Sequence, residues 1–165
     1  YWAVGRVQKN ILLKNFATEP GFSPKGKNLL QTLLVQYEDD FERWEDLYLR
    51  YPDRYKEEKA RLAQQIVERI EAQFPVFKGK IEVIETVSPY SFYRFCGAYK
   101  GSYMSFILTP YAPKKTHKGR IKGLTNLYLT GQWLQPPGGL PNAAVTGRFT
   151  IQRLCKAEGI PFNQG

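Results

Sequence analysis

The sequence predicts a mixed α+β fold, in which a β-sheet is combined with long amphipathic helices. In residues 53–74, apolar side chains recur every four positions from Leu62 to Phe74, which is typical of a helix with one buried face. Residues 28–37 are a short apolar run rich in Leu and Val, and residues 80–87 alternate in polarity, so both indicate strands. With 165 residues, 42% of them hydrophobic and 15% aromatic, the chain is large enough to bury a core.

The N-terminal part is expected to hold strands around a rigid loop. Residues 1–12 alternate loosely in polarity, as short strands do. Residues 19–27 (EPGFSPKGK) are dense in Pro and Gly, which indicates a loop. The chain opens on Tyr1, without an initiator Met, in what reads as the middle of a strand. We therefore expect it to be a piece of a longer protein.

Two helices are expected to follow. In the first, acidic residues 38–40 favour the positive end of the helix dipole, and Trp44 belongs to an apolar stripe at helical spacing. Pro52 is expected to end this helix, and Asp53 to cap the second one, over residues 53–74. An amphipathic core helix is the favoured interpretation of the second, and a partner-binding or membrane-surface helix is the alternative.

The C-terminal half is expected to alternate strands and helices. A half-buried strand is predicted over residues 80–87, and Ser88 with Pro89 is suited to the start of a short helix. Residues 126–130 predict a short strand, which a glycine-rich turn connects to a helix over residues 142–157. Strand, glycine-rich turn and helix is an order typical of turns that bring backbone close to a ligand.

The net charge of +9 is the most unusual bulk property. Its densest part is the basic run in residues 114–122, in a predicted loop. A solvated loop is the favoured interpretation, and a peripheral contact with an anionic membrane surface is the alternative. Nucleic acid is not an expected partner, because no recognised binding motif accompanies the charge. No apolar run approaches the roughly 20 residues needed to span a bilayer.

The two cysteines, Cys96 and Cys155, stand in apolar stretches and are expected to be buried free thiols. This indicates a reducing, cytoplasmic location, peripheral to the membrane if the basic loop contacts lipid. With His117 as the one histidine and no cysteine pair at ligand spacing, no metal site is expected.

The turn before the last predicted helix has the residues of a ligand site. Gly131 ends a strand without a side chain, and Gly138 and Gly139 permit positive φ and expose their amides. The helix that follows directs free N–H groups and its positive dipole end at the turn. Ala143 and Ala144 keep large side chains out of its first turns, so a flat group could pack close. A group that gains negative charge, such as a flavin on reduction, would be favoured here.

Residues 126–154 (NLYLTGQWLQPPGGLPNAAVTGRFTIQRL) closely resemble the C-terminal flavin-contacting motif of the phytoene desaturase, carotenoid isomerase and retinol saturase family. Upstream, residues 19–27 look like the family's Asp-Pro…Ala-Pro-x-Gly segment, and residues 87–94 (VSPYSFYR) match its Thr-Pro-x-Thr…Arg-Tyr region. Residues 101–103 (GSY) correspond to its Gly-x-Tyr-Gly element.

Two positions depart from that family's pattern. Met104 stands where the family usually has a second glycine, and Gln132 stands where related flavoproteins often carry an acidic residue for the ribityl chain. Gln can still hydrogen-bond a hydroxyl group. The chain also lacks the G-x-G-x-x-G fingerprint that follows a strand in dinucleotide-binding domains.

The resemblance implies that residues 1–122 are part of a substrate-binding domain. Residues 123–165 would be the C-terminal segment completing the FAD-binding domain, with the closing strand–turn–helix of a Rossmann-like fold. FAD would be the cofactor, held together with a missing N-terminal dinucleotide-binding half. The substrate would be an apolar small molecule, a carotenoid, a retinoid or another long polyene, that is desaturated, saturated or isomerised. Alone, this piece is expected to be inactive and to self-associate through the surfaces that would meet the missing half.

The flavin contacts that the resemblance implies are Gly131, Gln132, Gly138, Gly139, Leu140, Pro141, Ala143 and Ala144. No catalytic residue is assigned: Tyr93 and Arg94 are the candidates near a substrate, and a structural contact is the favoured interpretation of both. Trp133 is either a neighbour of the flavin ring or a packed core residue. Two other classes stay open, namely an amine-oxidase-like flavoprotein and a non-enzymatic membrane-surface binding module.

Overall fold

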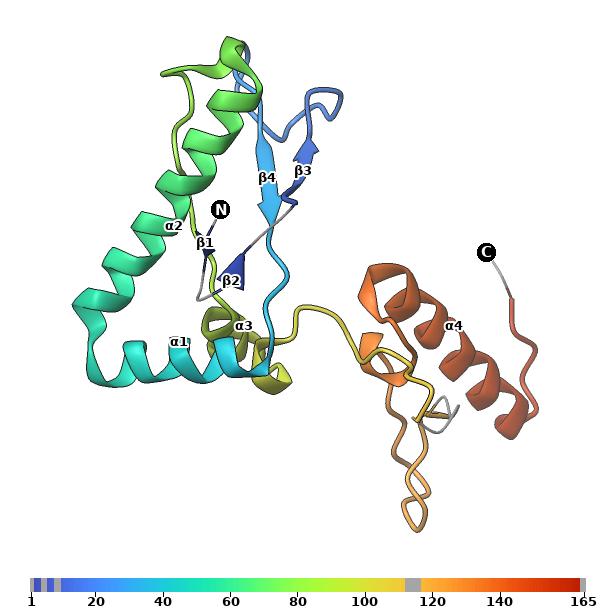
Figure 1. The fold of residues 1–165 in the computed structure, drawn as a ribbon. Coiled ribbons are helices and arrows are strands. Elements are labelled where there is room, and N and C mark those ends of the chain that lie inside the picture. Colours follow the sequence, from blue (N-terminus) through green and yellow to red (C-terminus); the bar gives the residue numbers. More distant parts are fainter. Residues whose placement is uncertain (1, 4–5, 8–9, 112–116, 164–165) are drawn as a thin grey trace. The chain divides into compact units, whose positions relative to one another are not determined.

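Figure 1 shows the computed structural model of the chain. The structure describes residues 2–3, 6–7, 10–111 and 117–163. It combines α-helices with two small antiparallel sheets, so the predicted mixed α+β class is confirmed. The chain divides into two compact units, Tyr1–Gly101 and Ser102–Gly165, which we call unit 1 and unit 2. The assignment of residues 1–122 and 123–165 to two domains of a larger enzyme stays a prediction.

Unit 1 begins with two short hairpins. β1 (Trp2–Ala3) pairs antiparallel with β2 (Arg6–Val7), and β3 (Leu12–Asn15) pairs antiparallel with β4 (Leu30–Leu33). The expected strands are therefore present but short. The Pro- and Gly-rich residues 19–27 lie in the loop between β3 and β4, as predicted.

Two helices follow and carry the core of unit 1. α1 (Glu38–Arg50) is followed, after one residue, by α2 (Pro52–Gln73). Pro52 is the first residue of α2, because its fixed φ suits the first helical turn and its missing N–H is not needed there. The prediction that Asp53 caps α2 is wrong: Tyr51 holds the cap position and Asp53 lies in the first turn.

The core of unit 1 is aromatic. Its buried members are Phe41, Trp44, Tyr55, Leu62 and Tyr90, with Leu34, Leu47 and Tyr48 packed against them. Trp44 of α1 is only 2% exposed, and its indole N–H donates to Oε1 of Gln36 over 2.7 Å. The rings of Trp44 and Tyr55 meet edge to face, with centroids 5.6 Å apart, an arrangement that such rings prefer. The apolar stripe predicted for residues 53–74 thus faces the core through Leu62 and Ile70.

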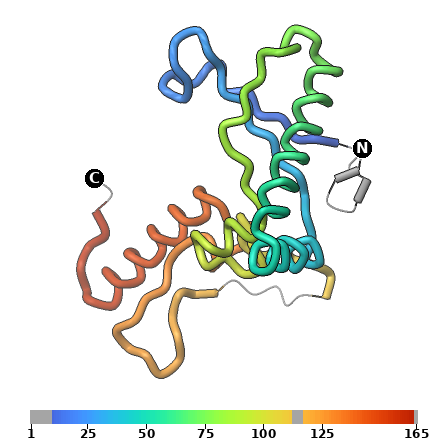
Figure 2. The backbone as a smooth tube through the Cα atoms, turned by 90° about the vertical axis from the view of Figure 1, so that its left-hand side faces the viewer, coloured from blue at the N-terminus to red at the C-terminus, as the bar shows by residue number. Residues whose placement is uncertain are grey.

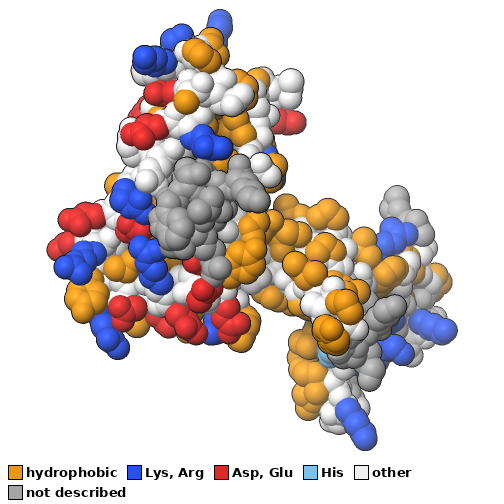
Figure 3. Space-filling view, viewed as in Figure 1, with side chains coloured by type: hydrophobic (Ala, Val, Ile, Leu, Met, Phe, Trp, Pro, Cys, Tyr) orange, Lys and Arg blue, Asp and Glu red, His pale blue; other side chains and the backbone are white. Residues whose placement is uncertain are grey.

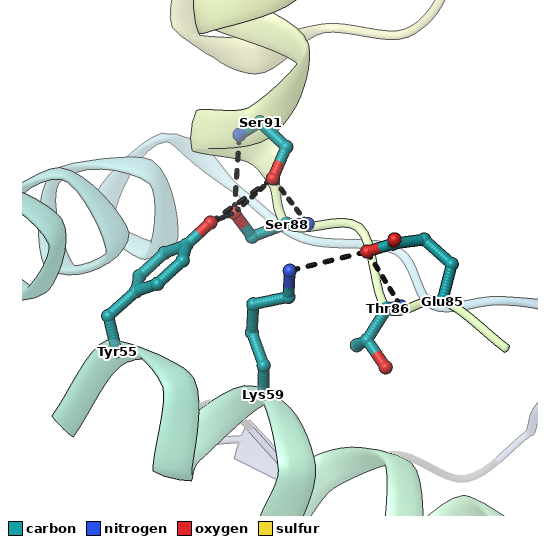
Figure 4. Close-up of polar contacts among 6 residues, drawn as sticks. All are labelled: Tyr55, Lys59, Glu85, Thr86, Ser88 and Ser91. Carbon is teal, nitrogen blue, oxygen red and sulfur yellow. Dashed lines mark hydrogen bonds and ion pairs between the residues drawn. The ribbon is translucent and has the colours of Figure 1, made fainter. Parts of the chain in front are cut away.

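A short 3₁₀ turn, Pro75–Phe77, follows α2, and α3 (Pro89–Cys96) then returns to the core. Ser88 caps α3 by accepting a hydrogen bond from the amide of Ser91, and Pro89 is the first helical residue, so the predicted helix start is confirmed. Figure 4 shows the hydroxyl of Tyr55 in α2 between the two serines, 2.8 Å from Oγ of Ser88 and 3.1 Å from Oγ of Ser91. This buried set of hydroxyl groups links α2 to the start of α3.

Unit 1 ends in a 3₁₀ turn, Tyr99–Gly101, which packs on α1 and α3. Within it Lys100 adopts a left-handed conformation, with φ of 47°. The Lys100 ammonium contacts Glu38 and Glu42 of α1 at 2.8 and 2.9 Å. Hydrogen bonds to these two carboxylates raise the pKa of Lys100 above its ordinary value.

The strand predicted over residues 80–87 does not form. The segment is extended but joins no ladder, because no described strand of the chain lies in register beside it. Its contacts include exposed ion pairs of Glu85 with Lys59 of α2 at 3.5 Å and of Glu82 with Lys27 at 3.9 Å, which contribute little to stability. The strand predicted over residues 126–130 is likewise absent as a ladder.

The expectation of two buried thiols is wrong for Cys96 and holds only in part for Cys155. Cys96 is exposed because it is the last residue of α3, where the helix ends at Gly97 in a left-handed cap. Cys155 is half-buried on a later helix. Cysteines in apolar stretches of sequence are therefore not both core residues here.

Unit 2 is built around one helix. A 3₁₀ turn, Gln132–Leu134, precedes α4 (Gly139–Glu158), which starts three residues before the predicted helix and ends one residue after it. Residues 117–130 form a narrow arm that extends away from α4, as Figures 1 and 2 show. The basic Lys114 and Lys115 lie outside the described residues. No helix in the described part of the chain is long and apolar enough to cross a bilayer.

Candidate functional site

The predicted site lies in unit 2, where a sharp bend at Gly131 meets α4. Gly131 has φ of 124° and ψ of 178°, a combination that is essentially restricted to glycine. Thr146 of α4 holds this bend: its hydroxyl accepts from the Gly131 amide over 3.1 Å and lies 3.0 Å from the Gly131 carbonyl. A Cβ built on Gly131 would meet no atom within 4 Å. The bend is therefore fixed by the helix and open on its side-chain face.

Gly138, at the start of α4, is different because the chain itself occupies its side-chain face. It has φ of 85° and ψ of −151°, again a glycine conformation. A Cβ there would lie 2.5 Å from the amide nitrogen and Cβ of Ser105, which is buried. The Ser105 amide also donates to the Pro137 carbonyl over 3.1 Å. Gly138 thus leaves room for the chain's own residues 104–106 to pack on the turn. A ligand cannot occupy the same space at Gly138.

The amides at the N-terminus of α4 are partly used within the chain. The Gly139 amide donates to Oε1 of Gln132 over 3.0 Å, so Gln132 acts as a cap of α4. Pro141 has no amide hydrogen. Of the donors that a helix leaves unpaired at this end, the Gly138 and Leu140 amides remain. The contact of Gln132 with a ribityl chain stays a prediction, and in the structure its side-chain oxygen accepts from the chain's own backbone.

The remaining predicted residues lie on the surface of α4 and of the turn before it. Leu140 is 87% exposed, Ala144 is exposed and Ala143 is half-buried. Trp133 is 43% exposed, so it is not a packed core residue of this chain. The structure brings the eight predicted contacts into one stretch, in which the side-chain face of Gly131 is open and Leu140 is exposed, while both backbone groups of Gly131 are bonded to Thr146.

Tyr93 and Arg94, the candidates near a substrate, lie in unit 1 and contact its aromatic core. The Tyr93 ring meets Phe41 edge to face at 5.6 Å, and the Arg94 guanidinium lies 4.3 Å from the centre of the Tyr48 ring. These contacts support the structural interpretation of both residues. Tyr90 beside them is buried, and burial raises the pKa of its hydroxyl.

A shallow groove of about 400 Å³ lies elsewhere, between α2 and the extended segment 80–87. Lys59 and Glu85 lie across it, and Figure 4 shows their ion pair beside Thr86. The groove is wide open, and its charged groups are paired with one another.

Two residues that position the site were not predicted from the sequence. Thr146 was passed over because threonine in a helix usually bonds to the preceding turn, as it does here to Ala143 in addition to Gly131. Ser105 was passed over because it is 33 positions away from Gly138 in the chain. The only local signal for Thr146 is that it is a threonine seven residues after the start of a helix that follows a glycine bend.

The charge of unit 2 is strongly one-sided. Unit 2 has eight Lys and Arg residues and one acidic residue, Glu158, which gives it +7 of the total +9. The described residues contain no group of three His, Cys, Asp or Glu side chains that could hold a metal ion. Unit 2 as a whole therefore has a strongly positive net charge, which favours an anionic ligand.

A flavin fits this site in part. The open side of Gly131 and the Leu140 amide suit a flat, electron-rich group, while the Ser105 contact fills the space at Gly138. Comparison with known proteins adds nothing to this geometry, since the chain matches no family model, no curated protein and no solved structure.

Proposed function

We propose that this chain is the C-terminal part of an FAD-dependent oxidoreductase that acts on carotenoid-like, retinoid-like or other long apolar polyenes. The observation that carries the proposal is the bend at Gly131, whose backbone is locked by Thr146 and whose side-chain face is empty. A flat ring can approach such a backbone closely, because no Cβ stands in its way.

The electrostatics of unit 2 support the same assignment. The positive end of the α4 dipole and the net charge of +7 favour a cofactor that carries phosphates and gains electrons. Within this proposal Gly131 lies against the cofactor and the Leu140 amide donates to it. Gly138, Gly139 and Gln132 shape the turn. When bound, FAD would supply the acceptance of a hydride equivalent.

The proposal also requires a second half of the protein to hold the nucleotide end of FAD. Apolar side chains of unit 2 would meet that half, and the most exposed of them beside the turn are Leu140 and Trp133. Exposed apolar surface beside a ligand turn is typical of a region that contacts another domain. Without this half the chain is expected to be inactive.

The test starts with the complete gene product that contains this chain. The coding sequence upstream is expected to encode a strand, a G-x-G-x-x-G turn and a helix, and the purified protein is expected to show the visible absorbance bands of a flavin. Gly131→Val should abolish FAD retention. Gly123→Val is the matched control, because Gly123 has a similar positive φ of 88° and an equally open side-chain face.

A second pair of variants keeps the test valid if Gly131→Val fails to fold. Leu140→Pro removes one amide hydrogen while proline still suits the first helical turn, and Leu140→Ala removes the side chain but keeps the amide. FAD is expected to bind more weakly to the first variant than to the second. A complete protein without a dinucleotide fingerprint, or full FAD retention in both Gly131→Val and Leu140→Pro, would contradict the proposal.

A further inference from the structure

The arm of unit 2, residues 117–130, is held by backbone hydrogen bonds and, at its base, by the side chain of Arg153 in α4, which donates to the Lys118 carbonyl over 2.6 Å. The Leu129 amide donates to the Gly119 carbonyl over 2.8 Å, and the His117 amide donates to the Leu134 carbonyl over 3.1 Å. At the far end, the Leu124 amide closes a turn onto the Ile121 carbonyl over 3.1 Å. The arm is therefore a supported hairpin-like loop, whose tip is residues 120–125.

Arg120 braces this tip. Its guanidinium donates to the Thr125 carbonyl over 3.1 Å and lies 4.8 Å from the centre of the Tyr128 ring. Gly123 has φ of 88°, so the tip turns through a conformation that suits glycine. Both features hold the two sides of the turn in place while its apolar side chains stay partly exposed.

The tip exposes apolar side chains to solvent. Ile121 is 42% exposed and Leu124 is 49% exposed, and both lie in the turn that Gly123 makes. Leu127, just behind them, is 41% exposed. Nearly half of the surface of each of these apolar side chains thus faces water at the end of the loop, an arrangement that becomes more favourable when another surface covers them.

The same loop is positively charged. Lys118, Arg120 and Lys122 alternate along it, and the sequence from residue 102 to residue 157 contains no Asp or Glu. On the face drawn in Figure 3, no Asp or Glu is visible on the described residues of unit 2, and Lys or Arg lies at its edges around apolar side chains. Apolar side chains at a tip and cations beside it match the two layers of an anionic bilayer surface, acyl chains below and charged headgroups above.

We propose that the tip of this arm docks onto the surface of an anionic lipid bilayer. Ile121 and Leu124 enter the boundary between headgroups and acyl chains, and Lys118, Arg120 and Lys122 contact the headgroups. The exposed apolar pair distinguishes this partner from nucleic acid, because a polyanion in water would leave both side chains in water. The inference does not depend on whether the chain holds a flavin.

The test measures co-sedimentation of the 165-residue chain with vesicles of phosphatidylcholine alone and with 30% phosphatidylserine. Binding to the anionic vesicles is expected, and it should weaken when the salt concentration rises from about 0.1 M to 0.5 M. Ile121→Ser with Leu124→Ser should weaken binding by about tenfold or more, because both side chains lose their place in the boundary region. Lys122→Glu should weaken it by about tenfold, because it reverses one charge next to the headgroups.

Matched controls come from unit 1. Val76→Ser with Ile84→Ser removes two side chains that are 67% and 78% exposed, and Lys78→Glu reverses an exposed charge. Neither should change vesicle binding by more than about twofold, since neither lies in the arm. Circular dichroism of every variant should match that of the unaltered chain.

Three results would overturn the inference. The first is vesicle binding that the arm variants leave unchanged. The second is equal binding to neutral and anionic vesicles. The third is no binding to anionic vesicles; if the chain then self-associates in analytical ultracentrifugation and the arm variants abolish this, the tip is assigned to a second copy of the chain. None of these readouts involves flavin absorbance, so failure here is distinguishable from failure of the proposed function.

Discussion

The hydroxyl groups of Tyr55, Ser88 and Ser91 provide a quantitative test of how α2 and α3 are held together. Tyr55→Phe deletes contacts of 2.8 Å to Ser88 and 3.1 Å to Ser91. The two serines keep one another, with their Oγ atoms 3.2 Å apart, so neither is left without a partner. A hydrogen bond contributes about 0.5–1.5 kcal/mol net, and the free energy of unfolding should therefore fall by about 1 kcal/mol.

Ser88→Ala should lower the free energy of unfolding further than Tyr55→Phe does, because Ser88 is also the cap of α3. Loss of a cap costs about 1 kcal/mol and loss of the contact with Tyr55 about another, so a decrease of about 2 kcal/mol is expected. The double variant that combines Tyr55→Phe with Ser88→Ala loses the hydrogen bond between Tyr55 and Ser88 only once. The combined decrease should therefore be smaller than the sum of the two by about 1 kcal/mol.

Urea unfolding, followed by tryptophan fluorescence and circular dichroism, measures these differences. Tyr99→Phe is the control, because its side chain is 73% exposed, and it should change stability by less than about 0.5 kcal/mol. The reasoning is refuted if Tyr55→Phe is no less stable than this control. It is equally refuted if the two losses simply add in the double variant.

Three further predictions concern single sites. Gly138→Ala should destabilise unit 2 by at least about 2 kcal/mol, because the new Cβ meets Ser105 in a backbone conformation that favours glycine. Gly159→Ala places its Cβ in open space and should cost about 1 kcal/mol. Hydrogen exchange of the α4 amides measures both losses of stability. The Arg61 side chain, by hydrogen bonding, holds the pKa of Glu58 below 4.5, so the stability from this pair should be present above pH 4.5 and lost as the pH falls through the lowered pKa. Carboxyl NMR titration should show the pKa of Glu58 rise in Arg61→Met, and an unchanged titration would contradict the assignment. Burial raises the pKa of Tyr90 above 10.0, so the unfolded state loses this proton first and stability should fall as the pH rises above 10; urea midpoints should show a smaller fall in Tyr90→Phe.

The helices of unit 1 could be predicted because their signals are local. The stripe through Leu62 and Ile70, and the pair Ser88 and Pro89, each lie within a few residues of the structure that they determine. Asp53 was misassigned because an acidic residue suits both a cap and a first turn. Proline at the first helical position decided between the two here.

The extended segment 80–87 shows what local patterns do not contain. Alternating polarity is compatible with a strand, but a ladder needs a second strand in register, and no described part of the chain supplies one. The same holds for residues 126–130, which became one side of the arm. A strand prediction from one segment therefore says which conformation is favoured and not whether it is paired.

The flavin contacts of the candidate site stay a prediction, and the structure adds contacts within the chain that the sequence alone does not show. The Gly131 bend and the start of α4 are adjacent, as the strand, turn and helix pattern indicates. The role of Gly138 depends on Ser105, and the role of Gln132 depends on the Gly139 amide, and both are contacts that only the folded chain reveals. Glycine marks a close approach of backbone, but the sequence does not say whether the approaching atom belongs to a ligand or to the chain.

Leu134 is the one buried hydrophobic residue in the described part of unit 2, whereas unit 1 buries a cluster of aromatic rings. Order in unit 2 must then come mainly from backbone hydrogen bonds and turn geometry, which open locally at low cost. Unit 2 has eight Lys and Arg residues at which trypsin can cut, so trypsin should cleave this loosely packed unit long before it cleaves the helices of unit 1. A partner that binds one unit would cover its cleavage sites and slow its digestion. The digestion products of this chain would therefore show which of the two units has a partner bound to it.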